Sequence, residues 1–343
     1  MNFVSIVVPT RNEEKKIEAC LRSILNLDFP KEKYEILVID GKSTDRTVEI
    51  ASKYPVRIIE NPKYKIGPAH NIGIKEAKGD IIVFTDADAQ VDTHWLKFLV
   101  EHFSNPDVGC VIGGQTCIFG DRFISQIRAA FHDYYDAKMV HQLKRTPHEV
   151  TWKSMSTFGT AFLKEALVNV GGFDESIDYP DKDIGYRLSQ KYKIIKDRRA
   201  TIRHYLNKPF TKYCTQIFRA SITEGILYRR YGVFLNKKSV LLTILVVVWL
   251  FGYLLSLTLL FLSLTHFIGA LEILLIPLIG FIVYYFVKGF KINIRKKSGL
   301  KGIIGLPFVS FLSVLLRSFG IIRGLLKIDV KGIYKTIKSN DTV

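Results

Sequence analysis

The first third of the chain alternates between two patterns of hydrophobic and polar residues. Short apolar runs, typical of buried strands, are separated by segments whose apolar residues recur at helical spacing. The runs predict strands over residues 3–8, 34–39, 56–59, 81–85 and 108–112. The helical spacing predicts helices over residues 12–25, 45–53, 68–78 and 93–103. Alternation of this kind indicates βαβ units, so we expect an α/β domain with a mostly parallel sheet that binds its ligand at the carboxyl ends of the strands.

The pattern is less regular over residues 116–238. It predicts a long helix over 121–143, a strand-like stretch near Phe162 and a helix that begins after Asp181. A further helix is predicted over residues 210–231, where apolar residues recur every four positions and arginines flank the apolar stripe. This amphipathic helix is expected either to lie at a membrane surface or to pack against the globular domain.

Two long apolar segments follow. Residues 240–264 contain no charged side chain, and residues 268–287 contain only Glu272. Uncharged segments of at least about 18 residues predict membrane-spanning helices, and the short connection predicts a transmembrane hairpin. Lysines and arginines flank the hairpin, which predicts a multi-pass protein of the cell membrane with its N-terminal domain on the cytoplasmic face. The run 302–326 is expected to be a re-entrant or surface-lying helix, or else a third span.

Charge and composition narrow the classes of protein. Of the 343 residues, 48% are hydrophobic, which excludes a disordered chain, and four cysteines without C-x-x-C spacing exclude a disulfide scaffold. The formal net charge is +17, and residues 239–343 carry 12 lysines and arginines against 3 acidic residues. A basic chain of this kind suits nucleic acid or anionic lipid. Because the basic residues accompany the apolar runs, we expect membrane lipid and no nucleic acid as a partner.

An acidic cluster directly follows the strand predicted over residues 81–85. Asp86 and Asp88 are two positions apart, and Gln90 continues the same side if the chain stays extended. Three oxygen donors at the carboxyl end of a strand suit Mg²⁺ or Mn²⁺. The alternative for such a short pattern is a solvated acidic loop.

Two other residues are candidates for ligand contacts. Asp40 ends the strand 34–39, where it could accept hydrogen bonds from a base or a ribose, or could serve as a turn or helix-capping acid. His204 could approach a metal or a diphosphate, although a lone histidine is more often structural.

Five segments together resemble the family 2 glycosyltransferases of the GT-A fold. They are SIVVPTRNEE at 5–14, VIDGKSTD at 38–45, GPAHNIG at 67–73, GDIIVFTDAD at 79–88 and GGFDE at 171–175. The resemblance covers about residues 1–231 and follows the order of the family's motifs. It implies a Rossmann-like nucleotide-sugar-binding domain over 1–115, an acceptor-side half over 116–208, an interfacial helix over 209–238, the hairpin over 239–287 and a basic tail over 288–343.

The resemblance also implies roles for individual residues. The metal ligands are Asp86 and Asp88, with Gln90 similar to a third ligand in dolichyl-phosphate mannose synthases. The catalytic base is Asp181, which stands in the segment PDKDIGYRL where the family has an E-D pair, and Pro180 replaces the glutamate. Asp183 is the alternative base, or else an acid at the N-terminus of a helix. The residues implied in nucleotide-sugar binding are Pro9, Thr10, Arg11, Glu13, Asp40, His70, Asn71 and Ala87.

We therefore expect a membrane-anchored inverting glycosyltransferase that depends on Mg²⁺ or Mn²⁺. Its donor is a nucleotide-diphosphate sugar and its acceptor a lipid-linked saccharide or a glycolipid. Two alternatives stay open: a polyprenyl-phosphate monoglycosyl synthase, which Gln90 favours, and a catalytically inactive membrane scaffold that binds nucleotide sugars.

Overall fold

The computed structural model describes residues 3–119, 125, 147–206, 209–233 and 312–324. The chain divides into two compact units. The first comprises Met1–Asp121 with Met139–Asn207, and the second comprises Arg122–Lys138 with Lys208–Val343. The helix predicted over residues 121–143 and the two predicted membrane spans lie outside the described residues.

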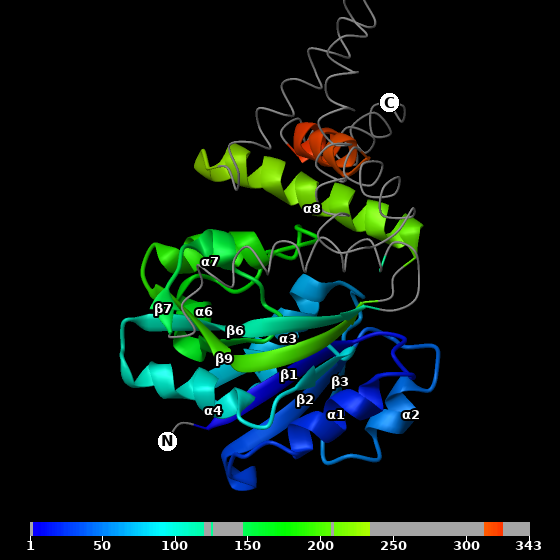
Figure 1. Ribbon diagram of the computed structural model, residues 1–343, viewed down its shortest axis with the longest axis vertical. Helices are drawn as coiled ribbons and strands as arrows, with labels where there is room; N and C mark the ends of the chain where they lie inside the picture. Colours follow the sequence, from blue (N-terminus) through cyan, green and yellow to red (C-terminus); the bar gives the residue numbers. More distant parts are fainter. Residues whose placement is uncertain (1–2, 120–124, 126–146, 207–208, 234–311, 325–343) are drawn as a thin grey trace, which may run out of the picture. The chain divides into compact units, whose positions relative to one another are not determined.

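The first unit is a sheet covered by short helices (Figure 1). Its strands are β1 (Val4–Thr10), β2 (Tyr34–Asp40), β3 (Arg57–Glu60), β4 (Ile81–Phe84), β5 (Ala89–Val91), β6 (Val108–Phe119), β7 (His148–Glu149), β8 (Thr160–Leu163) and β9 (Lys193–Leu206). Its α-helices are α1 (Ile17–Leu25), α2 (Thr47–Ala51), α3 (Ile66–Glu76), α4 (Trp95–Val100), α6 (Lys164–Asn169) and α7 (Asp181–Ser189).

The strands run in the order β3-β2-β1-β4-β8-β6-β9-β5, and β7 pairs with β9. The four strands β1 to β4 are parallel, as the alternation of strands and helices predicts. The prediction of a mostly parallel sheet holds only in part, because four of the eight strand pairings among the described residues are antiparallel. The hydrophobic pattern did not predict β9. Its 14 residues carry charged side chains on both faces of the strand, so apolar and polar residues do not alternate.

Two apolar clusters hold the helices on opposite faces of the sheet. One cluster contains the buried residues of α1, α2 and α4 and residues such as Ile6 and Val8 of β1. The other contains the buried residues of α3, α6 and α7 and includes Val7 of β1. Alternate residues of a strand point to opposite faces, so β1 supplies both layers of the core.

Most helix ends lie within a few residues of those predicted, but α1 begins at Ile17 and not at residue 12. Residues 11–16 instead form a loop at the carboxyl end of β1. Asn12 has a φ of 55°, in the left-handed region, and its side chain bonds to the loop after β2. This conformation ends the strand and delays the helix.

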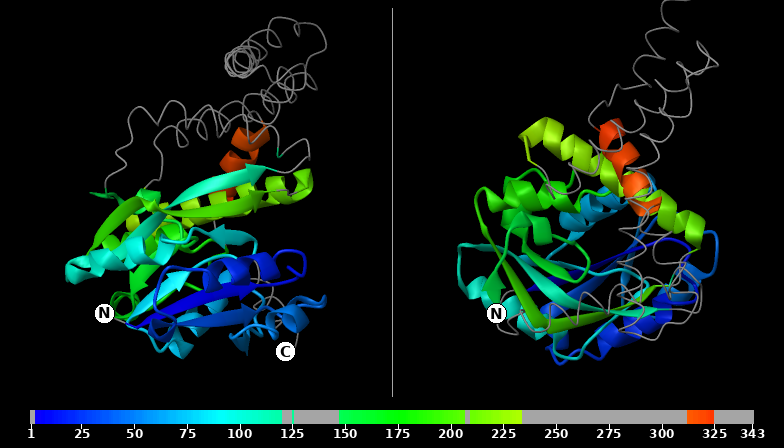
Figure 2. Two further views of the ribbon diagram at one scale, coloured as in Figure 1. Left: turned by 60° about the horizontal axis from the view of Figure 1, so that its bottom comes forward. Right: turned by 45° about the horizontal axis from the view of Figure 1, so that its top comes forward.

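The second unit contains α8 (Phe210–Tyr231), which forms over the residues predicted. It ends at Gly232, whose φ of 66° suits a helix C-terminus. Residues 312–324 form another helix that lies beside α8 (Figure 2). The hydroxyls of Tyr213 and Ser313 are 3.2 Å apart, and the Arg323 guanidinium lies 5.8 Å from the centre of the Phe218 ring.

The predicted localisation, a multi-pass protein of the cell membrane, is contradicted. Among the residues that the structure describes, no helix combines the length and the apolar character that crossing a membrane requires. The segments on which the prediction depended, 240–264 and 268–287, are outside those residues, and the run 302–326 is described only over 312–324.

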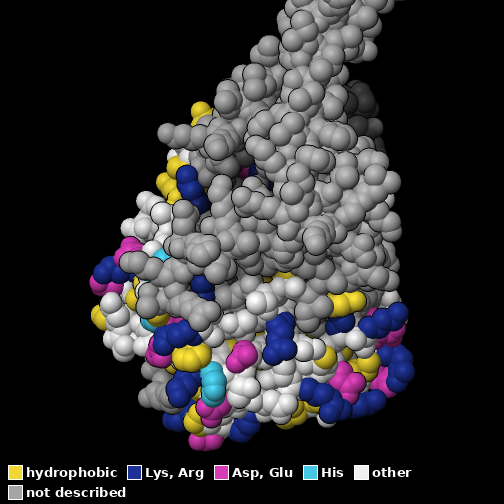
Figure 3. Space-filling model, in the orientation of Figure 1, with side chains coloured by type: hydrophobic (Ala, Val, Ile, Leu, Met, Phe, Trp, Pro, Cys, Tyr) yellow, Lys and Arg dark blue, Asp and Glu magenta, His cyan; other side chains and the backbone are white. Residues whose placement is uncertain are grey.

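Charges of both signs mix on the surface of the first unit (Figure 3). Exposed pairs such as Arg22–Glu18 and Arg46–Glu49 have nitrogen–oxygen distances of 2.8 and 2.9 Å. On the face drawn, lysines and arginines therefore alternate with acidic side chains.

Candidate functional site

The loops at the carboxyl ends of β1 and β2 are bonded to each other. The amide of Asn12 donates to the Ser43 hydroxyl at 2.9 Å, and the amide of Thr44 donates to Asn12 Oδ1 at 2.8 Å. The amide of Glu13 donates to the Thr47 hydroxyl at 2.8 Å. These bonds fix one rigid rim at this edge of the sheet.

Asp40 and Thr10 occupy neighbouring positions on this rim, as partners in the register of β1 and β2. Asp40 is 6% exposed and accepts hydrogen bonds from the amide and the hydroxyl of Ser43, at 3.0 and 2.6 Å. It is therefore a turn acid, which leaves its remaining lone pairs for a ligand. The Thr10 hydroxyl is buried and has no hydrogen-bond partner among the described residues.

Sequence reasoning missed Tyr64, an aromatic platform beside this rim. Its ring lies 4.9 Å from the Arg11 guanidinium and 5.6 Å from the Lys42 ammonium. Tyr64 is 47% exposed and has a φ of 56°, which is rare for a bulky side chain and occurs mainly at functional positions. The sequence carries no signal for this conformation, because neither spacing nor composition reports a backbone angle.

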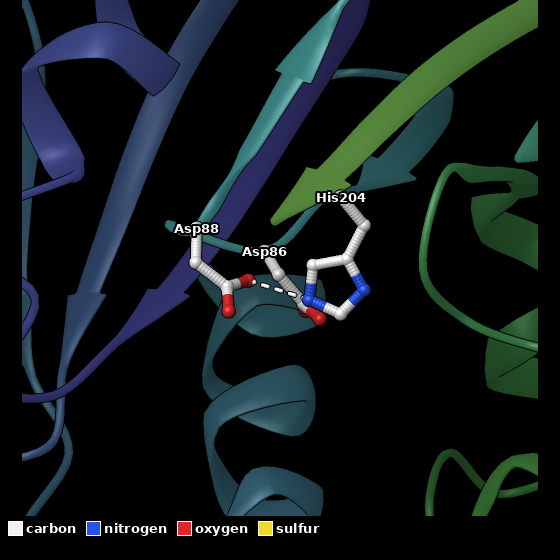
Figure 4. Close-up of side chains that lie close together, drawn as sticks. All are labelled: Asp86, Asp88 and His204. Atoms are coloured by element: carbon white, nitrogen blue, oxygen red, sulfur yellow. Dashed lines mark ion pairs between the residues drawn. The ribbon is translucent and has the colours of Figure 1, made fainter. Parts of the chain in front are cut away.

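The acids predicted as metal ligands converge with a histidine. Asp86 and Asp88 follow β4, and His204 comes from β9, opposite Ala89 in the register with β5 (Figure 4). Their ligand atoms all lie within 4.8 Å of one another, and His204 Nε2 is 2.9 Å from Asp88 Oδ1. Two carboxylates and one imidazole in this arrangement fit a divalent cation.

Gln90 lies on the other face of β5. It is exposed and pairs in register with Arg203, whereas the neighbouring pair is Ala89 with His204. Directly paired residues of antiparallel strands share a face and adjacent residues do not. His204, and not Gln90, therefore stands third beside the two aspartates.

Lys16 provides a positive charge next to this cluster. Its ammonium lies 3.6 Å from Asp88 Oδ2 and 3.2 Å from Glu13 Oε2. The charge of Asp88 is thus balanced from two sides, by Lys16 and by His204 when the imidazole is protonated. Glu13, implied in nucleotide binding, is placed here as the partner of Lys16.

Asp181 is the first residue of α7 and lies at the same edge of the sheet. Its Oδ1 accepts a hydrogen bond of 2.7 Å from the hydroxyl of Thr157. The next residue, Phe158, packs its ring against the imidazole of His204 with centres 4.7 Å apart. Burial raises the pKa of Asp181 above that of an ordinary carboxyl, while Thr157 and Lys182 act in the opposite direction.

Asp183 has different surroundings. It is completely buried and receives hydrogen bonds of 2.9 and 2.5 Å from Nε and a terminal nitrogen of Arg187. Arg187 also donates to the carbonyl of Val170. Asp183 thus forms a buried ion pair with Arg187. This is a structural role for an acid in the first turn of α7.

His70 and Asn71 lie on the inner side of α3. His70 is 1% exposed and packs between the rings of Phe84 and Phe173, and burial lowers its pKa to about 3, so the imidazole is neutral. Asn71 Oδ1 accepts from the amide of Phe173 at 2.8 Å, and its Nδ2 donates to the Phe173 carbonyl at 2.9 Å. A Cβ on Gly172, whose φ is 68°, would lie 2.8 Å from Asn71 Oδ1. Asn71 therefore holds the turn at 171–175.

The other residues implied in nucleotide-sugar binding lie at the same edge with different exposure. Pro9 is buried in β1 and Ala87 is 2% exposed between the two aspartates. Arg11 is exposed and stacks on Tyr64. The edge therefore brings together Thr10, Arg11, Asp40 and the cluster of Asp86, Asp88 and His204, whereas His70 and Asn71 support the loops behind it.

Comparison with known proteins shows which class of enzyme the chain resembles. Residues 5–167 match the model of the family described as glycosyl transferase family 2. A dolichyl N-acetyl-α-D-glucosaminyl phosphate 3-β-D-2,3-diacetamido-2,3-dideoxy-β-D-glucuronosyltransferase of Methanococcus voltae is 26% identical over 95% of this chain and 98% of its own. A dolichol-phosphate mannosyltransferase of Pyrococcus furiosus is 36% identical over 35% of this chain and 33% of its own.

A solved structure supports the fold. The mannosyltransferase of Pyrobaculum calidifontis, solved with GDP-mannose and Mn²⁺, superposes with a TM-score of 0.60 at 20% identity, covering 95% of this chain and 88% of that one. The protein is therefore a glycosyltransferase with a GT-A-like α/β fold, and its residues 5–167 match the family 2 model.

Proposed function

We propose that this glycosyltransferase moves a sugar from a nucleotide-diphosphate sugar to a lipid-linked saccharide or glycolipid, with inversion and with a divalent cation. The observation that carries the proposal is the position of Asp181. It lies at the same sheet edge as Asp86, Asp88 and His204, to which it is linked through Thr157 and Phe158. A base and a cation site at one edge suit transfer between a diphosphate leaving group and a hydroxyl.

The nucleotide is proposed to occupy the rim of β1 and β2. Among the described residues the Thr10 hydroxyl has no hydrogen-bond partner and the Asp40 carboxylate bonds only to Ser43, so both suit the polar edge of a base or ribose. The exposed ring of Tyr64, with Arg11 and Lys42 against it, offers a face for stacking and positive charge for phosphate.

The cation would be held by Asp86, Asp88 and His204. Mn²⁺ accepts both carboxylate and imidazole ligands, and the mixed donor set favours it over Mg²⁺, which prefers oxygen. When bound, such a cation would neutralise the charge that develops on the diphosphate leaving group. Lys16 adds a second positive charge next to Asp88.

Asp181 is the proposed base. Its carboxylate takes the proton of the acceptor hydroxyl while the hydroxyl oxygen attacks the anomeric carbon and the bond to the diphosphate breaks. One displacement without a covalent intermediate inverts the configuration. Burial brings the pKa of Asp181 closer to the working pH, which strengthens a general base.

The acceptor class follows from the relatives. The Methanococcus voltae enzyme, by its name, acts on a dolichyl-linked sugar phosphate and matches this chain almost end to end. We extend to this chain only the general chemistry, a saccharide joined to a lipid. We set aside an inactive scaffold, because the sequence retains Asp86, Asp88 and Asp181, the acids that the proposed reaction uses.

A polyprenyl-phosphate monoglycosyl synthase is the second candidate. The similarity to the Pyrococcus furiosus dolichol-phosphate mannosyltransferase favours it. In that reaction the nucleophile is an ionised phosphate, which needs no base. The function of Asp181 therefore separates the two candidates.

Donor screening tests the proposed function. The full-length protein with Mn²⁺ is incubated with UDP-, GDP- and dTDP-sugars, and binding is measured by calorimetry beside sugar release. We expect tight binding and slow hydrolysis for one donor class. Absence of binding to every nucleotide sugar would contradict the proposal.

Replacement of Tyr64 by alanine should weaken donor binding. Stacking of a base on an aromatic ring contributes about 1–3 kcal/mol, so we expect the donor Kd to rise about 5- to 100-fold. Calorimetry with the donor identified by screening gives this value. Tyr64→Phe retains the ring and should bind normally, and equal losses in both variants would rule out stacking.

Replacement of Thr157 by valine should change the pH dependence of transfer. The Thr157 hydroxyl donates to the Asp181 carboxylate and lowers the pKa of that group. Without this donor the pKa rises, so the base becomes protonated at a higher pH. We expect the acidic limb of the kcat/KM profile to move to higher pH in Thr157→Val and to stay in place in Thr157→Ser. A limb that does not move in Thr157→Val would separate Asp181 from the titrating group.

A further inference from the structure

Three cationic side chains follow one another, and the first of them, Lys182, adjoins Asp181. Lys182 follows it on α7, and Lys196 and Arg198 come from β9. Lys196 is close enough to lower the pKa of Lys182, and Arg198 is close enough to lower that of Lys196. Burial acts in the same direction on both lysines. We name these three residues the cationic cluster.

The strand register places Lys196 level with the carboxyl end of β4. Phe84, the last residue of β4, pairs with Thr160, Thr160 pairs with Ile112, and Ile112 pairs with Lys196. Residues in one such row share a face, so Lys196 projects on the face of Phe84. That face is covered by α7. Lys196 therefore lies level with Phe84 at the end of β4. Asp86 follows Phe84 by two residues.

Arg198 lies in a bulge of β9, where the pairing with β6 shifts. Gly113 pairs with Asp197 and Gly114 with Thr201, so residues 198–200 have no partners in β6. Asp197 is fully buried and bonded to His102 at 2.9 Å, which anchors the start of this bulge. The backbone of Arg198 lies so close to Gly114 that a Cβ there would be 2.7 Å from the Arg198 carbonyl. The position of Arg198 is thus fixed by packing.

The cluster has an excess of positive charge. In the part of the chain that the structure describes, the side chains of Lys196 and Arg198 form no ion pair or hydrogen bond, and Arg198 Nε is buried. The Lys182 ammonium donates to the carbonyls of Lys153 and Met155, at 2.7 and 2.5 Å. Partly buried cations without acidic partners are costly, and a bound anion would offset that cost.

We propose that the cationic cluster binds a phosphoryl group of the acceptor, so that the acceptor is a lipid-linked sugar phosphate. This inference rests on the proposed function and deepens it. Asp181 adjoins Lys182, so a phosphate on the attacking sugar would be near the hydroxyl that Asp181 deprotonates. Three cations suit a phosphoryl group, which offers several oxygen acceptors, better than the single charge of a carboxylate.

The test measures binding of four probes to the full-length protein in EDTA, by calorimetry. The probes are farnesyl phosphate, neutral farnesol, farnesoic acid and inorganic phosphate. Each is measured with the wild type, Lys196→Gln, Arg198→Gln and Lys193→Gln. Lys193 is the matched control, because it is the first residue of the same strand, three residues before Lys196, and its charge is already paired with Asp107 at 3.1 Å. Binding of the nucleotide donor to each variant is measured separately with Mn²⁺.

We expect farnesyl phosphate to bind best and its Kd to rise about 10- to 100-fold in Lys196→Gln and Arg198→Gln, as for loss of a charge-assisted hydrogen bond. Lys193→Gln and all donor affinities should be unchanged. Equal binding of farnesol or farnesoic acid, or equal binding of inorganic phosphate, would overturn the acceptor-phosphate assignment. So would a matching loss of donor affinity, which would assign the cluster to the donor. A wild type that binds farnesyl phosphate but no nucleotide sugar would contradict the proposed function and leave this inference standing.

Discussion

Replacement of Asp181 by asparagine should reduce transfer about 10²- to 10⁴-fold, the usual contribution of a positioned general base. Asparagine is nearly isosteric and still accepts the hydrogen bond from the Thr157 hydroxyl, so the local structure should persist. Asp181 has no position on the nucleotide rim, so donor affinity should be unchanged. Turnover with the best donor and acceptor, measured beside donor binding by calorimetry, gives both values.

Asp183→Asn is the matched control, since Asp183 lies two residues along the same helix. Its carboxylate is buried against Arg187, and loss of one partner from such a pair costs about 3–5 kcal/mol of folding free energy. We expect a lower midpoint of thermal unfolding and a smaller loss of rate. Normal turnover in Asp181→Asn with an inactive, donor-binding Asp183→Asn would reverse the assignment. Activity in both variants would favour the polyprenyl-phosphate synthase.

Replacement of Asp88 by asparagine should reduce transfer by about 10³-fold or more, because charge neutralisation by a bound cation stabilises the departing diphosphate by several kcal/mol. Asp88 sits between His204 and Lys16, and its replacement leaves the Lys16 ammonium with less negative charge beside it. We also expect weaker Mn²⁺ binding, measured directly by electron paramagnetic resonance of the free ion. This second readout does not depend on the reaction.

The control for Asp88 is Asp107→Asn, which removes an exposed carboxylate near the amino end of β9. It should leave Mn²⁺ binding and transfer unchanged. His204→Gln should weaken Mn²⁺ binding less than Asp88→Asn, since it retains both carboxylates. Full activity of Asp88→Asn in excess EDTA would exclude a cation-dependent reaction.

The sequence determined the first half of the fold and one part of the site. The strands β1, β2 and β4 are nearly continuous apolar runs because both of their faces are covered, and such runs are readable without a structure. Asp86 and Asp88 directly follow one of these runs, so their position at a strand end was predictable. The resemblance to the family motifs singled out Asp181. Its role as the catalytic base stays a prediction.

Only the tertiary structure decided which side chains join those acids. His204 is far from Asp88 in the chain, and the register of β5 with β9 puts it beside the two aspartates and turns Gln90 to the other face. The left-handed φ of Tyr64 and the bulge that presents Arg198 are backbone features of single residues. Short-range patterns report which residues are buried. They do not report which distant strands pair, and that pairing, set by the packing of the whole sheet, assembled the site.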